Sequence, residues 1–124
     1  MMQKVIFLLV GFLFGISAYA QNAEEILLGK WTNPDETRVI EFVQNGGFYE
    51  AIILKSDDTS FEGRKQITHL KYHKNGIYKD GMVHVFKKDR TLACKANLLS
   101  IDELELSVSF GFMSKSAVWT RVEN

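Results

Sequence analysis

The sequence predicts an all-β fold: a small antiparallel up-and-down barrel of about eight strands, preceded by a short N-terminal helix. Three observations support this prediction. From Lys30 onward apolar and polar residues alternate, as they do in strands with one buried face. Turn-forming residues recur between short apolar runs, which leaves no room for crossover helices. One tryptophan stands near each end of the folded part, at Trp31 and Trp119, and each is followed by threonine.

The first twenty residues are expected to be a signal peptide rather than part of the fold. Lys4 precedes the apolar run Val5–Ile16, which is shorter than the roughly 20 residues that a membrane-spanning helix needs. An Ala-Tyr-Ala cleavage signal ends at Ala20. We therefore expect a signal peptide over 1–20, one domain over 21–124, and a periplasmic or secreted mature chain without a stable membrane span. An uncleaved anchor is the alternative, but nothing apolar extends the run.

The composition of the mature chain limits what it can bind. Removing 20 of the 124 residues leaves 104, enough for one hydrophobic core. The loss of Lys4 leaves 14 basic and 15 acidic side chains, so no strong field attracts nucleic acid. Cys94 is the only cysteine, so an internal disulfide cannot form and packing must provide the stability. A small buried side chain is the ordinary role for Cys94, and a reactive thiol or intermolecular bridge is the alternative.

A short helix is expected at the start of the mature chain. Asn22 can cap it, Glu25 occupies the capping-box position, and Gly29 suits the position just after the last turn. Only one or two turns fit before the first strand begins at Lys30.

Strands and turns then follow in a regular series. Asn-Gly-Gly at 45–47 predicts a tight hairpin, because asparagine and glycine accept positive φ. Further turn signals lie at 74–76, 79–81, 87–90 and 100–103. The expected strands are 37–43, 48–55, 67–73, 76–79, 82–86, 91–99, 103–112 and 115–122. Residues 56–66 are expected to form a surface loop, and the alternative that 62–73 form a helix stays open.

The clearest strand is the segment 103–112, with one apolar and one polar face. The polar face carries glutamates and serines. The apolar face carries Leu104, Leu106, Val108, Phe110 and Phe112. This pattern predicts a half-buried strand with one side in water.

Barrel closure explains the position of the two tryptophans. In a closed barrel the first and last strands pair, because closure removes the exposed edges. Trp119 shares a strand face with Arg121. The short helix, the Gly-x-Trp sequence at Gly29–Trp31 and this arginine resemble the calycin (lipocalin-like) barrels. The resemblance implies that Gly29, Trp31, Trp119 and Arg121 close the barrel, with the arginine packed across the first tryptophan.

Nearly the whole mature chain resembles, as a divergent member, a bacterial domain-of-unknown-function family numbered 2147. The matching positions are Gly29, Trp31, Tyr49, Ile52, Gly76, Tyr78, Gly81, Trp119, Thr120 and Arg121. The chain departs from the pattern at Ala51, where a glycine is common, and in 84–90, which lacks an Asp-Pro pair. The family has no established activity, so the resemblance implies architecture and export only.

No group of residues predicts a metal site, a cofactor or catalysis. His69 and His73 would lie about 13 Å apart on a strand, at about 3.3 Å per residue, too far to share one ion. The segment 56–63 lacks the spacing of a calcium loop. The serines lack a Gly-x-Ser-x-Gly context, and the chain has no phosphate loop. We therefore expect no enzyme, no catalytic or metal-binding residue and no cofactor, unless His84 and the other histidines converge with a carboxylate.

The aromatic side chains leave two functions open. They either line a ligand cavity or fill the core of a small barrel. The leading hypothesis is an exported, non-catalytic protein that binds a small apolar or amphipathic ligand, lined by Tyr49, Phe86, Phe110 and Phe112. The alternative is a cell-envelope interaction module with a filled core. A continuous interior cavity favours the first, and a packed interior with an exposed apolar patch favours the second.

Overall fold

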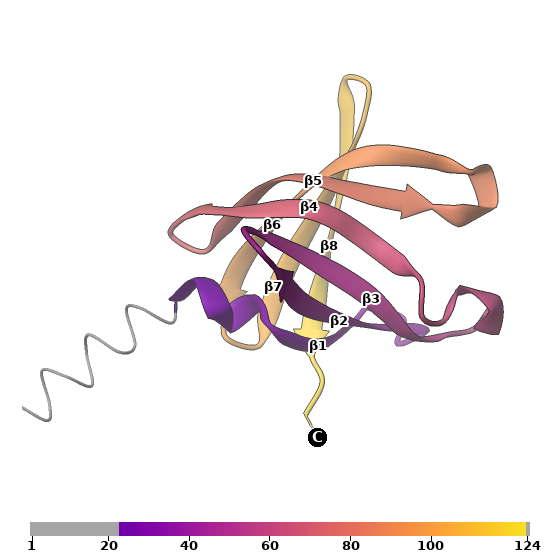
Figure 1. Ribbon diagram of the computed structural model, residues 1–124, viewed down its shortest axis with the longest axis horizontal. Helices are drawn as coiled ribbons and strands as arrows, with labels where there is room; N and C mark the ends of the chain where they lie inside the picture. Colours follow the sequence, from indigo (N-terminus) through magenta and orange to yellow (C-terminus); the bar gives the residue numbers. More distant parts are fainter. Residues whose placement is uncertain (1–22, 124) are drawn as a thin grey trace, which may run out of the picture.

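The protein is a closed antiparallel barrel of eight strands that follow one another in chain order (Figure 1). The structure is a computed structural model that describes residues 23–123. Each strand pairs with the next, and the last strand returns to pair with the first. The predicted all-β up-and-down barrel is therefore confirmed. The signal segment 1–20 and the capping residue Asn22 lie outside the described residues.

The connections between successive strands lie alternately at the two ends of the barrel. The strands are β1 Gly29–Thr32, β2 Arg38–Asn45, β3 Phe48–Ser56, β4 Lys65–Lys74, β5 Ile77–Val85, β6 Arg90–Ser100, β7 Glu103–Phe110 and β8 Met113–Arg121. The short 3-10 helices are η1 Ala23–Leu27, η2 Thr59–Phe61 and η3 Phe86–Lys88. Tight turns join β2 to β3, β4 to β5 and β6 to β7 at the end where η1 lies, which we call the closed end. The connections that contain η2 and η3, and the β7–β8 turn, lie at the opposite, open end. No helix within residues 23–123 is long and apolar enough to cross a membrane.

Two sequence predictions are resolved by β4 and β5. Residues 65–74 are a strand, so the helical alternative for 62–73 is wrong. The turn predicted at 79–81 is also wrong, because β5 runs through it as one strand with a register shift after Tyr78. Asp80 has φ of 64°, which marks a bulge that bends the strand without reversing it. Gly81 is needed at the bend, since a Cβ there would lie 2.7 Å from the Cys94 sulfur.

The closed end is filled by large side chains. Trp31, Tyr49 and Tyr78 are fully buried, and the rings of Tyr49 and Tyr78 meet edge to face with centroids 5.4 Å apart. The Tyr78 hydroxyl donates a hydrogen bond of 2.5 Å to the Glu24 carbonyl, and the Trp31 indole donates one of 2.9 Å to the Leu27 carbonyl. These bonds fix η1 across the end of the barrel.

Arg121 joins the last strand to the first strand and to η1. Trp31 pairs with Arg121 in the β1–β8 register, and the guanidinium lies 4.2 Å from the centre of the indole. Its nitrogens donate to the carbonyls of Leu28 at 3.0 Å, Ile101 at 2.6 Å and Ile26. Gly29 leaves room for this group, since a Cβ there would lie 2.8 Å from the nearer guanidinium nitrogen. The two ends of the chain therefore meet through Arg121 and Trp31.

Candidate functional site

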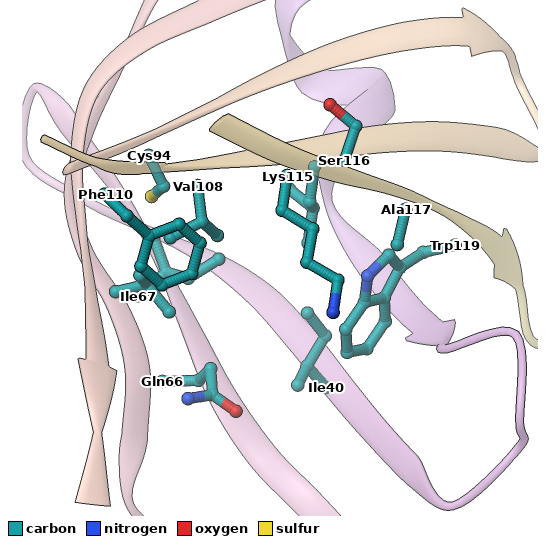
Figure 2. A pocket seen from close by; sticks show the side chains of 12 residues that line it. Ile40, Gln66, Ile67, Cys94, Val108, Phe110, Lys115, Ser116, Ala117 and Trp119 are labelled. Atoms are coloured by element: carbon teal, nitrogen blue, oxygen red, sulfur yellow. The ribbon is translucent and has the colours of Figure 1, made fainter. Parts of the chain in front are cut away.

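The open half of the barrel contains a cavity of about 250 Å³ that communicates with solvent (Figure 2). Its walls come from β2 and from β4 through β8. Most of the side chains that face it are apolar. The lining residues are Ile40, Gln66, Ile67, Val83, Cys94, Leu106, Val108, Phe110, Lys115, Ser116, Ala117 and Trp119.

Several of the inward side chains that face the cavity are short. Inward positions of β6, β7 and β8 carry Cys94, Val108 and Ala117. At the closed end the corresponding space is occupied by the rings of Trp31 and Tyr78. The same strands therefore pack a core at one end and leave a void at the other.

The hydrogen-bonding groups of two polar residues in the wall are already engaged. The Gln66 carbonyl oxygen accepts from Arg38 at 2.6 Å, and its amide nitrogen donates to the His84 carbonyl at 2.8 Å. The Ser116 hydroxyl lies 2.7 Å from that of Ser107. These contacts satisfy polar atoms that would otherwise be costly to bury.

Lys115 is the exception in the cavity wall. Within residues 23–123, no hydrogen bond or ion pair engages its ammonium. It lies opposite Val108 in the β7–β8 register and is solvent-exposed near the open end. Figure 2 shows its side chain extending from β8 among the lining residues. The cavity thus has one cation whose hydrogen-bonding capacity is free.

Cys94 contributes a neutral side chain to the wall. Its exposed fraction is 6%, and burial raises the pKa of the thiol to about 12. At neutral pH the group therefore carries its proton and is a poor nucleophile. No group of three metal-ligating side chains lies together within the part of the chain that the structure describes.

An aromatic pair borders the open end. Phe61 of η2 packs against Phe86 of η3, with ring centroids 5.1 Å apart. The Arg64 guanidinium lies 3.9 Å from the centre of the Phe86 ring, and that of Arg38 lies 5.6 Å from the centre of Phe61. Stacking of this kind joins the two loops that flank the cavity entrance.

The four aromatic residues predicted to bind ligand lie in four different places. Phe110 lines the cavity and is 44% exposed. Tyr49 belongs to the packed closed end, and Phe86 borders the open end on η3. Phe112 is fully exposed, because β7 ends at Phe110 and Gly111 turns the chain with φ of 60°. The predicted alternation therefore stops two residues early, and Phe112 does not share a face with the rest of the strand.

Trp119 lies on the cavity wall, although the sequence placed it with the closure residues. Thr120 and Arg121 make the contact with β1, and Trp119 lies one position before them. Lys115, Ala117, Trp119 and Arg121 all point inward by simple alternation along β8. This pattern was the signal that could have identified Lys115, which sequence reasoning missed because lysine is normally exposed.

Two of the three histidines meet at one hydroxyl outside the cavity. His69 Nδ1 lies 3.0 Å and His84 Nε2 lies 3.1 Å from the Thr68 oxygen. His73 is exposed further along β4. A single threonine hydroxyl has one proton, so it can donate to only one of these two rings at a time.

Two solved structures have a similar fold. Protein HP1028 of Helicobacter pylori, which belongs to the lipocalin family, matches with a TM-score of 0.66 and 19% identity over 79% of this chain and 84% of that one. A redesigned β barrel matches with a TM-score of 0.55 and 16% identity over 82% and 96% of the two chains. No family model and no curated protein sequence matches the chain. The fold is therefore lipocalin-like, and the resemblance to family 2147 stays a prediction.

Proposed function

We propose that the chain is an exported, non-catalytic protein that holds a small apolar or amphipathic ligand in the cavity at the open end of the barrel. The observation that carries this proposal is the apolar cavity of about 250 Å³ with access to solvent. A barrel of eight strands is just wide enough to hold one small ligand. Removing apolar ligand surface from water supplies the driving force. The buried, protonated thiol of Cys94 supports binding rather than chemistry at this wall.

The volume sets the size of the ligand. An apolar cavity of about 150 Å³ admits benzene, which has six carbon atoms. If the number of atoms scales with cavity volume, a cavity of about 250 Å³ is filled by a molecule of about ten non-hydrogen atoms. A larger ligand would extend through the open end and contact Phe110.

Native mass spectrometry of the exported protein tests this function. The mature chain is expected to carry a small-molecule adduct that leaves on denaturation. Ala117→Phe should abolish the adduct, because the new ring projects into the cavity from β8. Val118→Phe is the matched control, since Val118 is exposed on the same strand. A bare protein mass for the wild type, or an adduct that persists in Ala117→Phe, contradicts the proposal. Recovery from the exported fraction tests the signal peptide at the same time.

One observation favours the alternative function, an envelope interaction module. The β7–β8 turn projects beyond the neighbouring strands and exposes Phe112 completely and Met113 by 63% (Figure 1). Exposed apolar side chains at one tip are a feature of protein contact sites. Cross-linking in intact cells, compared between the wild type and Phe112→Ser, separates the two functions. Loss of a discrete cross-linked partner in the variant, together with a bare protein mass, supports the interaction module.

A further inference from the structure

We infer that the cavity selects small amphiphiles with a negatively charged head group, and that Lys115 binds that group at the open end. This inference rests on the proposed function and adds the chemical class of the ligand. It follows from the charge balance of the cavity wall, the position of Lys115 along β8, and the direction in which the cavity runs.

The charge balance favours an anion. Lys115 is the one charged residue among the described residues that line the cavity. Asp and Glu are not among them, Gln66 is already hydrogen-bonded at both ends of its amide, and Cys94 is neutral. A ligand carboxylate or similar group would therefore find one free positive charge and no opposing negative charge in the wall.

The direction of the strands orients the ligand. β8 runs from the open end at Met113 to the closed end at Arg121, so Lys115 lies nearer to solvent than Trp119. β7 runs the opposite way, which places Leu106 deeper than Phe110. A head group at Lys115 thus leaves the apolar tail pointing inward, toward Leu106 and Trp119.

The exposure of Lys115 sets the strength of this selection. Because Lys115 is a solvent-exposed residue, an ion pair formed there keeps much of its hydration and avoids the large desolvation cost of a buried pair. The ion pair therefore adds only modestly to the binding affinity. We expect the cavity to bind an anionic head group about five times more tightly than a neutral one. A cationic head group should be rejected through repulsion by the same ammonium.

Three probes with the same tail test the inference. Octanoate, 1-octanol and protonated octylamine share an eight-carbon chain and differ in head-group charge, and octanoate has the ten non-hydrogen atoms that suit the cavity. Binding to the mature chain is measured by calorimetry at low salt. Tryptophan fluorescence is a second readout, since Trp119 lines the cavity. We expect octanoate to bind about five times more tightly than 1-octanol, and octylamine to bind most weakly.

Three substitutions assign the effect to Lys115. Lys115→Met keeps a side chain of similar length and removes the charge. It should weaken the binding of octanoate about fivefold and leave the affinity for 1-octanol unchanged. Lys115→Arg should retain the preference. Lys95→Met is the matched control, because Lys95 is an exposed lysine beside Cys94 on β6 and is not part of the cavity wall. Thermal unfolding of each variant shows whether it is folded.

The outcomes separate this inference from the function on which it rests. If 1-octanol binds as tightly as octanoate and Lys115→Met changes neither, the cavity binds apolar ligands but the head-group inference is wrong. If no probe binds and Ala117→Phe changes nothing, both the inference and the proposed function fail. A fivefold preference that Lys115→Met abolishes and Lys95→Met retains supports both.

Discussion

Substitution of Arg121 by methionine should remove much of the stability of the barrel. The guanidinium donates hydrogen bonds to three main-chain carbonyls, those of Ile26, Leu28 and Ile101. Each such bond contributes a net of about 1 kcal/mol, and the stacking on Trp31 adds about 0.5–1 kcal/mol. The ion pair with Asp102 contributes little, because the atoms are 3.9 Å apart and the Asp102 side chain is largely exposed. We therefore expect a loss of about 3.5–4 kcal/mol in the free energy of unfolding.

Urea denaturation of the mature chain at neutral pH measures this loss. For a domain of this size, about 3.5–4 kcal/mol corresponds to a fall of about 20 °C in the melting temperature. Arg90→Met on the exposed start of β6 is the control and should change the free energy of unfolding by less than about 0.5 kcal/mol. A loss of less than about 0.5 kcal/mol for Arg121→Met, with an unchanged denaturant slope, would mean that Arg121 does not hold the two ends together.

Two further predictions concern β5 and β6. Gly81→Ala should lower the free energy of unfolding by about 1–3 kcal/mol, because the new Cβ would lie 2.7 Å from the Cys94 sulfur. Gly47→Ala is the control in the same urea melts, because a Cβ at Gly47 would meet no atom within 4 Å. Adding Cys94→Ala should recover part of this loss, and a strictly additive double variant would contradict the proposed clash. Stability should also fall as pH rises from about 9 to about 12, because the unfolded thiol ionises near 9.0 whereas the folded one keeps its proton to about 12. Urea melts of the wild type and Cys94→Ala across that range test this, and identical pH dependence in the two proteins would refute the contribution of Cys94.

The fold was predictable because one face of nearly every strand is buried. The alternation over 103–110 specifies β7 without reference to any other segment, and the glycines at 46 and 47 specify the first hairpin. The error at 79–81 has a physical cause. Lys-Asp-Gly is a turn sequence, but here the glycine is required by close packing against Cys94 and Asp80 forms a bulge. Local sequence does not distinguish these two uses of glycine.

The cavity was not predictable in the same way. Its volume depends on which side chains from β2 and from β4 through β8 face the same interior space. Cys94 and Val108 are register partners on β6 and β7, and Ala117 on β8 lies opposite Leu106. All of them line the cavity, which no single strand reveals. Sequence reasoning offered a filled core or a cavity as alternatives, whereas the protein has a filled closed end and a hollow open end.

Two cations on β8 show why a residue's role depends on its level in the barrel. Lys115 and Arg121 both project inward, because they are six residues apart on a strand whose side chains alternate. At the closed end, Arg121 donates to the carbonyls of Ile26 in η1 and of Leu28 just after it, and it stacks on Trp31. Its charge therefore stabilises the fold. At the open end Lys115 meets apolar walls and solvent, and nothing within the described chain engages its charge. The same alternation that closes the barrel at one end therefore leaves a cation at the mouth of the cavity, where the partner that remains for it is a ligand.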